Sequence, residues 1–423
     1  MVDSWVEDVH SLGQGRISRA ILQPCRRAYE DSNLATALLA RRLLTPCQAI
    51  DEAALLLEEG TISDVGRRSD VLIPPHTRVF DFGEAILAPG LIDIHIHGGA
   101  GHDIMEASDE NLAPIERLMA KHGVSSYYPT TVTAPVDVTL RSLDALGQAV
   151  GRGLDRVYAG DGTRARPLGI HLEGPFLSHA KRGVHPAALL QPASRELFDR
   201  MWQAAAGHVR LMTIAPEING AIDLIGEASK RGVCVSIGHS DAQLRQARAG
   251  IKAGARHATH TFNAMRALDH RYPGLLGAVL TESGVTADII VDGIHVDPVV
   301  VDLFVRARGL DASVLITDAI SATGMPNGKY TLGGLEVEVR SGRCESNGRL
   351  AGSVLTLDRA VRNTVKFANI SLQNAIRMAT VNPARTLGIE NRKGTLSVGA
   401  DADITVFTPA GEVLQTIIGG IIN

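Results

Sequence analysis

Short apolar runs alternate with amphipathic segments through the middle of the chain. Each run has the length of a buried β-strand, and the segments between the runs have helical periodicity. The predicted strands are Leu91–His97, Val124–Thr130, Leu168–Glu173, Val209–Ala215, Val233–His239, His257–His260, Thr286–Val291 and Val314–Asp318. The predicted helices are Asp109–His122, Val136–Val150, Arg195–Ala206, Gly220–Arg231, Asp241–Ala253 and Pro298–Arg308. This alternation predicts an α/β fold with a closed, TIM-like (β/α)8 barrel. An open doubly wound sheet is the alternative, although no GxGxxG motif opens a first helix.

Both ends of the chain have β-type patterns instead. The N-terminal strand candidates are Ala35–Leu39, Ala53–Glu58, Thr61–Val65 and Arg78–Phe82. Residues 393–423 have alternating apolar positions and turns, and end with a strand candidate at Val413–Ile418. We therefore expect residues 34–85 and 393–423 to form one small β-sandwich domain and residues 86–392 to form the barrel. Residues 1–33 have little periodicity and are predicted to be a poorly ordered or loosely docked extension.

Composition is consistent with a large globular domain and a smaller one. The chain has 423 residues, of which 45% are hydrophobic and 21% are charged. A net charge of −4 without a basic run argues against binding to nucleic acid. Aromatic residues make up only 4% of the chain, which argues against a stacking platform for single strands or long sugar polymers.

The cysteines and the first residues indicate a cytoplasmic protein. The four cysteines are far apart and form no CxxC pair, so we expect reduced thiols at Cys25, Cys47, Cys234 and Cys344. Acidic residues among the first eight positions do not fit a secretory signal. No stretch approaches the roughly 20 apolar residues that span a bilayer, so no membrane partner is expected.

Several predicted strands end in a histidine or a carboxylate. In a (β/α)8 barrel, functional residues lie at the C-terminal ends of the strands. Those positions hold His95, His97, Glu173, His239, His260, His295 and Asp318. Histidine, Glu and Asp are the ligands of a divalent metal ion that activates water. Each residue alone also fits a structural role; Glu173, for example, fits a helix cap or an ion pair. On composition, His257 is as good a candidate for a site residue as His260.

The motifs at these strand ends resemble a known family. The segment Pro89–Gly98 is similar to the first-strand signature of the amidohydrolase superfamily. Six further segments, in order, resemble the N-acetylglucosamine-6-phosphate deacetylase family: His171–Leu177, Gly238–Ser240, His260–Met265, Asp292–His295, Thr317–Ala319 and Leu350–Ser353. The resemblance runs from about Ala35 to the C-terminus.

This resemblance implies a metal-dependent reaction. Glu173, His239 and His260 fall on the family's metal ligands. Asp318 falls on its catalytic acid/base, and His185 on a catalytic residue that contacts substrate near the acetyl group. Because His95 and His97 are both present, a second ion is possible, with Glu173 as the bridge. The ion is expected to be divalent, with zinc favoured over iron, manganese or cobalt.

The resemblance also implies a substrate, an amino-sugar phosphate. The positions that correspond to substrate contacts are Val184, His185, Asn263, Ala264, Arg271, His295, Leu350, Ala351 and Gly352. The implied reaction removes the N-acetyl group of N-acetylglucosamine 6-phosphate, giving glucosamine 6-phosphate and acetate. A homodimer is expected, in which Arg271 acts on the phosphate in its own or the neighbouring subunit.

Three other functions stay open on the sequence. The same chemistry on N-acetylgalactosamine 6-phosphate differs only in loop contacts that the sequence does not place. Another amidohydrolase activity would not need Arg271 and His295 near each other. A non-catalytic sugar-phosphate sensor is expected to lose one of the site residues, whereas Glu173, His239, His260 and Asp318 are all present.

Overall fold

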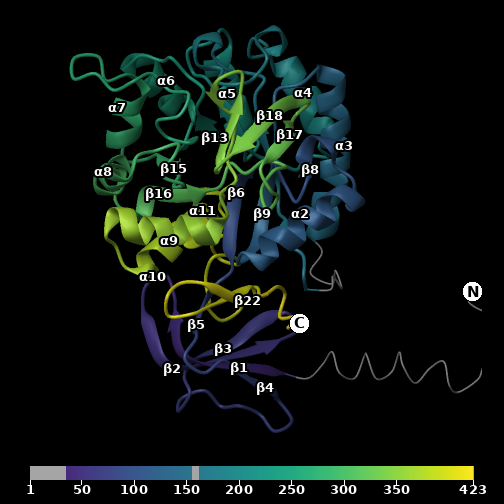
Figure 1. Ribbon diagram of the computed structural model, residues 1–423, viewed down its shortest axis with the longest axis vertical. Helices are drawn as coiled ribbons and strands as arrows, with labels where there is room; N and C mark the ends of the chain where they lie inside the picture. The colour runs from purple at the N-terminus through teal and green to yellow at the C-terminus, as the bar shows by residue number, and fades with distance from the viewer. Residues whose placement is uncertain (1–34, 155–161, 423) are drawn as a thin grey trace, which may run out of the picture.

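A computed structural model describes residues 35–154 and 162–422 of the chain (Figure 1). A barrel surrounded by helices lies above a smaller β domain in this view. The predicted extension over residues 1–33 lies outside the described residues. Among the helices that the structure describes, none combines the length and apolar character needed to cross a bilayer.

The barrel has eight parallel strands, as predicted. In order they are β6 (Leu91–Ile96), β9 (Val124–Thr131), β11 (Ile170–Glu173), β12 (Val209–Ile214), β13 (Cys234–Ile237), β14 (His257–Ala258), β15 (Thr286–Ile290) and β16 (Ser313–Ile316). The first and last strands meet through a parallel bridge between Ile96 and Ala319. The Asp318 N–H also donates to the His95 carbonyl at 2.9 Å. The barrel is therefore closed at the point where the candidate residues of its first and last strands come together.

The six predicted helices form around this barrel as α2 to α6 and α8, and four further helices, α7 and α9 to α11, were not predicted. The helices are α2 (Asp109–Lys121), α3 (Val136–Gly153), α4 (Arg195–Ala204), α5 (Ala221–Lys230), α6 (Leu244–Ala253), α7 (Gly274–Thr281), α8 (Pro298–Arg308), α9 (Leu357–Ala368), α10 (Leu372–Met378) and α11 (Val381–Thr386). Short polar residues cap several of them: the side chains of Ser108, Ser194 and Asp297 accept N–H groups in the first turns of α2, α4 and α8. Short 3₁₀ helices lie at Ile104–Glu106, His179–Lys181, Ala187–Leu189 and Leu310–Ala312.

Alternation along β11 divides apolar from polar side chains. Ile170 and Leu172 belong to the main apolar core, whereas His171 and Glu173 face the barrel interior, as the two-residue period predicts. His171 Nε2 lies 2.8 Å from the Thr213 hydroxyl, and its ring centroid lies 4.6 Å from that of His95. A hydrogen-bonded polar layer therefore fills the barrel directly beside the candidate site.

Both chain ends build the small β domain. Its strands are β1 (Thr36–Leu44), β2 (Ala49–Glu58), β3 (Thr61–Arg67), β4 (Arg78–Asp81), β5 (Ile86–Pro89), β21 (Ile404–Phe407) and β22 (Val413–Ile417). The sheet order is β22-β21-β5-β1-β2-β3, with β4 beside β1. β5 lies at the start of the range predicted for the barrel, residues 86–392, but it pairs with β1 and β21 in the small sheet. The Ile62 N–H donates to the Ala400 carbonyl at 2.9 Å, so the C-terminal segment also reaches β3.

An antiparallel insertion follows the last barrel strand and was not predicted. Its strands are β17 (Gly328–Leu332), β18 (Leu335–Arg340), β19 (Arg343–Ser346) and β20 (Arg349–Leu350). Three two-residue strands complete the described β structure: β7 (Gly98–Gly99), β8 (His102–Asp103) and β10 (Arg166–Pro167). Loops of the insertion reach the C-terminal end of the barrel, where the candidate residues lie.

Candidate metal centre

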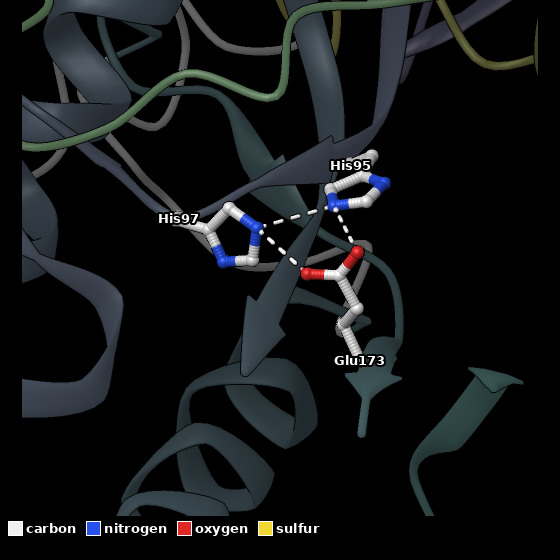
Figure 2. Close-up of side chains that lie close together, drawn as sticks. All are labelled: His95, His97 and Glu173. Atoms are coloured by element: carbon white, nitrogen blue, oxygen red, sulfur yellow. Dashed lines mark hydrogen bonds and ion pairs between the residues drawn. The ribbon is translucent and has the colours of Figure 1, made fainter. Parts of the chain in front are cut away.

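Glu173 is the centre of a buried cluster of imidazoles. Its Oε1 lies 3.0 Å from His260 Nε2 and 3.2 Å from His239 Nε2. Its Oε2 lies 3.2 Å from His97 Nε2, and His95 Nε2 lies 3.5 Å from Oε1 (Figure 2). These residues form two possible metal-binding groups that share Glu173: one with His239 and His260, and one with His95 and His97.

The ends of the strands turn sharply to present these side chains. His239, His260 and Asp318 follow β13, β14 and β16 with φ values of +47°, +30° and +50°. Such left-handed backbone is uncommon for residues other than glycine and is concentrated at functional sites. The observed strand β14 is therefore shorter than the predicted strand His257–His260, because the chain leaves the sheet after Ala258.

The structure also distinguishes His260 from His257. His257 Nε2 lies 2.9 Å from Asp288 Oδ2, and its Nδ1 lies 2.7 Å from the Thr286 hydroxyl. His257 is thus occupied inside the barrel wall. The other oxygen of Asp288 accepts the backbone N–H of His260, so this carboxylate helps to hold the residue that does face Glu173.

Hydrogen bonds to backbone carbonyls fix the tautomers of two imidazoles. His239 Nδ1 lies 2.9 Å from the Lys181 carbonyl, and His97 Nδ1 lies 3.1 Å from the Thr130 carbonyl. A carbonyl only accepts, so each Nδ1 carries the proton and each Nε2 of the neutral ring presents a lone pair. Each Nε2 faces Glu173 at 3.2 Å, where either a proton or a metal ion can lie between the nitrogen and the carboxylate.

The spacing of the donor atoms fits a metal ion. The Nε2 atoms of His239 and His260 are 3.0 Å apart, and those of His95 and His97 are 3.1 Å apart. Nitrogen or oxygen ligands about 2.0–2.1 Å from a tetrahedral ion lie about 3.3 Å from one another. All donor atoms within each group lie within 4.8 Å of one another. The chain therefore has buried His/Glu groups that can hold a divalent metal ion.

Without an ion, the same carboxylates attract protons to the imidazoles. Burial lowers the pKa of His97, but Asp318 and Glu173 outweigh it and raise this pKa to about 10. Burial likewise opposes protonation of His260, but Glu173 raises the pKa of His260 to about 9. Burial lowers the pKa of His239 to about 4. Protons and a metal ion thus compete for the same nitrogen lone pairs.

Asp318 faces the cluster from the last strand. Its Oδ1 lies 3.2 Å from His97 Nε2 and 3.6 Å from His95 Nε2. Burial alone would raise the pKa of this carboxyl, but His97 and His95 hold it at about 2. The loop at Gly352 packs directly behind Asp318: at φ +61°, a Cβ at Gly352 would lie 2.9 Å from the Asp318 carbonyl oxygen. Asp318 is therefore an ionised carboxylate in a fixed position.

His185 presents the opposite tautomer from His239. The backbone N–H of Thr133 donates to His185 Nδ1 at 3.3 Å, so Nδ1 accepts and Nε2 carries the proton. The Thr133 hydroxyl lies 2.8 Å from the same Nδ1. His185 Nε2 lies 3.6 Å from Glu173 Oε2. His185 can therefore donate a hydrogen bond into the site, and sequence reasoning did not identify Thr133 as its partner.

A cavity opens over the cluster. Its lining includes most of the predicted site residues: His97, Glu173, Val184, His185, His239, His260, Asn263, Ala264, His295, Asp318, Leu350 and Gly352. His95 lies beneath the surface with no exposure. His295 Nδ1 lies 2.7 Å from Asp292 Oδ2, which leaves Nε2 free to face the cavity.

Two predicted substrate residues lie apart from the cavity wall. Ala351 is fully buried between Leu350 and Gly352. Arg271 lies on the exposed loop before α7, outside the residues that line the cavity in the described part of this chain. Conversely, Val132 and Leu332 line the cavity but were not predicted, because an apolar residue at a strand end carries no signal in the sequence.

Comparison with known proteins identifies the family of this chain. Residues 86–422 match a family model described as "Amidohydrolase family". Since this match covers more than half of the chain, the protein belongs to the amidohydrolase family.

Relatives within this family are similar along most of the chain. A protein of Bos taurus named N-acetylglucosamine-6-phosphate deacetylase is 37% identical over 386 residues, 88% of each chain. A protein of Escherichia coli O157:H7 named N-acetylgalactosamine-6-phosphate deacetylase is 36% identical over 384 residues, 90% of this chain and 98% of that one. A solved structure of N-acetyl-D-glucosamine-6-phosphate deacetylase from Mycobacterium smegmatis, a D267A mutant in complex with N-acetyl-D-glucosamine-6-phosphate, has a TM-score of 0.85 and 34% identity, covering 92% of this chain and 100% of that one.

Proposed function

We propose that this protein hydrolyses the N-acetyl group of N-acetylglucosamine 6-phosphate, giving glucosamine 6-phosphate and acetate. The observation that carries the proposal is the placement of Asp318 beside a metal-binding group: its carboxylate faces the same cavity as Glu173, His239 and His260. Relatives at 35–37% identity named for this activity support the same substrate.

Glu173, His239 and His260 are the residues that would hold the metal ion, and we propose zinc. When bound there, a divalent cation supplies Lewis-acid polarisation and lowers the pKa of a water molecule. His95 and His97 would hold a second ion, with Glu173 between the two positions. Backbone carbonyls accept the Nδ1 protons of His97 and His239, so Nε2 is the nitrogen of each ring that faces Glu173.

Asp318 carries the proton through the reaction. It accepts a proton from the attacking water as the water oxygen bonds to the acetamide carbonyl carbon. As the carbon–nitrogen bond breaks, Asp318 returns that proton to the leaving nitrogen. Acetate and the free amine are then the products. A carboxylate that is ionised at neutral pH suits the first step, because it must accept a proton before it can donate one.

His185 stabilises charge on the carbonyl oxygen. Its Nε2 carries the proton because Nδ1 accepts from the Thr133 backbone. A hydrogen bond from a fixed donor strengthens as negative charge develops on the oxygen in the transition state. Thr133 therefore sets the orientation and the tautomer of His185.

The phosphate binds at the other side of the cavity, near Asn263 and His295. Asp292 accepts the backbone N–H groups of Ile294 and His295 and lies against the His295 ring, which directs the other ring nitrogen toward a ligand. Because Arg271 is exposed on its own chain, we propose a homodimer in which Arg271 reaches the phosphate of the neighbouring subunit. We also propose that the enzyme acts in the cytoplasm.

N-acetylgalactosamine 6-phosphate is a second candidate substrate, because a relative of similar identity is named for it. The deciding experiment measures acetate release from both amino-sugar phosphates, with protein of assayed metal content. We expect faster release from the gluco substrate. Faster release from the galacto substrate would reverse the assignment. Binding of either sugar phosphate by metal-loaded protein without acetate release would indicate a sensor.

A further inference from the structure

Two apolar side chains form one wall of the cavity, and neither has a role in the proposed chemistry. Val132 directly follows β9 and is 2% exposed, and Leu332 ends β17 and is 3% exposed. Both line the cavity that holds Glu173 and Asp318. An apolar wall in a polar active site points to an apolar part of the ligand.

This wall is held rigidly from behind. The turn after Leu332 packs against Val132 so closely that a Cβ at Gly333 would lie 2.0 Å from Val132 Cγ1. The Gly333 N–H donates to Asp103 Oδ2 at 2.7 Å, and the other oxygen of Asp103 accepts the Met105 N–H at 2.8 Å. Val132 also packs in an apolar cluster with Met105 and Ala134. Val132 and Leu332 are therefore packed too tightly to move aside for a longer ligand group.

The barrel order places this wall opposite the phosphate side. Counted around the barrel, β9 is the second strand and β14 is the sixth, so the two are diametrically opposed. Val132 follows β9, whereas Asn263 follows β14 and His295 follows β15. In this circular order, Glu173 on β11 and His239 after β13 lie along one path from β9 to β14, and Asp318 after β16 and His95 on β6 lie along the other.

A substrate amide that lies at the centre must extend in both directions. The carbonyl carbon bears the nitrogen, which leads to the sugar and phosphate, and the acyl methyl group, which points the other way. With the phosphate near His295, the methyl group is directed toward β9. We infer that Val132 and Leu332 form the acyl pocket and limit the substrate to short N-acyl groups, an inference that rests on the proposed function.

The test compares acyl groups of increasing length on the same sugar phosphate. N-acetyl, N-propionyl and N-butyryl glucosamine 6-phosphate are assayed by amine release, with wild type, Val132→Ala and Leu332→Ala. We expect the wild type to lose kcat/KM sharply beyond acetyl. Each variant should raise the propionyl-to-acetyl ratio of kcat/KM about tenfold, since one methylene is discriminated by about 10–200-fold in a tight pocket.

A matched control distinguishes a specific effect of the cavity wall on acyl preference from a general effect of removing apolar side chains. Val138 on α3 packs against the same apolar cluster but does not line the cavity, so Val138→Ala should keep the wild-type ratio. Val132→Ile serves as a second variant if Val132→Ala does not fold. It shortens the pocket and should raise the formyl-to-acetyl ratio.

The outcomes separate this inference from the proposed function. If Val132→Ala and Leu332→Ala release acetate but keep the wild-type acyl preference, the inference is overturned and the proposed function stands. If Val138→Ala shifts the ratio equally, the inference is also overturned. If the metal-loaded wild type releases amine from no N-acyl sugar phosphate, both are overturned.

Discussion

The Asp318 carboxylate lies 3.2 Å from Nε2 of His97, across the seam where the last barrel strand meets the first. The Asp318 N–H donates to the His95 carbonyl, and its own carbonyl accepts the Ser353 N–H at 2.7 Å. Backbone bonds from two segments therefore fix this carboxylate beside the metal-binding residues without making it part of either metal-binding group that Glu173 shares.

Asp318→Asn should lower kcat by about 10²–10⁴-fold, because the amide keeps the size of the side chain but cannot accept the proton. Metal content should stay near that of the wild type, since Glu173, His239 and His260 are unchanged. Steady-state kinetics and metal analysis of the same preparation check both statements. A variant that turns over at the wild-type rate would exclude Asp318 as the acid/base.

Metal affinity should increase with pH. In the ion-free protein the pKa values of His97 and His260 are raised to about 10 and 9, so at neutral pH both rings hold protons that a metal ion must displace. Apparent affinity should then rise about tenfold per pH unit for each proton displaced. Titrations in chelator-buffered zinc at pH 6, 7 and 8 measure the slope, and an indicator dye measures the released protons. An affinity that is flat over this range would contradict the proposed coupling.

His295→Ala should raise KM for the phosphorylated substrate with a smaller effect on kcat, because the proposed role of this cavity-lining ring is to bind the phosphate and not the reacting amide. Arg271→Ala should do the same if the neighbouring subunit supplies this arginine. Unphosphorylated N-acetylglucosamine is the control, since neither substitution should change its kcat/KM. A residue whose removal leaves KM for the phosphorylated substrate unchanged does not belong to the phosphate site.

Asp358 should stabilise the fold at neutral pH and cease to do so in acid. It lies 3.2 Å from His122 and 2.9 Å from Arg362, and these partners hold its pKa below the usual range although burial acts in the opposite direction. A depressed folded-state pKa gives stability that is present above the unfolded pKa, about 3.9, and is lost as the pH falls further. Asp358→Asn should cost about 1–3 kcal/mol at pH 7.

Thermal unfolding at several pH values checks the Asp358 prediction. The difference in Tm between Asp358→Asn and wild type should shrink as the pH is lowered below 4. Asp302→Asn is a matched control, because Asp302 pairs with Arg306 on the exposed side of α8, and surface pairs contribute about 0–1 kcal/mol. Equal destabilisation by both substitutions would show that burial does not increase the contribution of the Asp358 ion pairs to the stability of the fold.

The sequence identified the barrel because short apolar runs alternate with amphipathic segments, and several of these runs end in a histidine or a carboxylate. Glu173 shows the physical reason. A carboxylate at the end of a buried strand needs a cation or hydrogen-bond donors, so the sequence alone predicts that such groups surround it. The position of β5 was not predictable in the same way. Its apolar run continues into β6 with only Gly90 between them, and hydrophobicity does not say which sheet a strand joins.

Other parts of the site lack a local signal. His257 and His260 have similar neighbours in sequence, and they are distinguished only in the fold, where His257 pairs with Asp288 and His260 faces Glu173. The β17–β20 insertion has short strands with many charged residues, which resemble loop sequence. Leu332, at the end of β17, therefore reaches the cavity through a contact that depends on the folded barrel.

The central place of β5 in the small sheet has a consequence for protein synthesis. One neighbour, β1, leaves the ribosome before it, whereas the other, β21, follows only after the entire barrel. The nascent chain must therefore carry an unpaired, apolar strand edge throughout that interval, and such edges promote aggregation. A chain terminated after residue 392 would retain every residue of the metal centre, yet we expect it to accumulate in inclusion bodies.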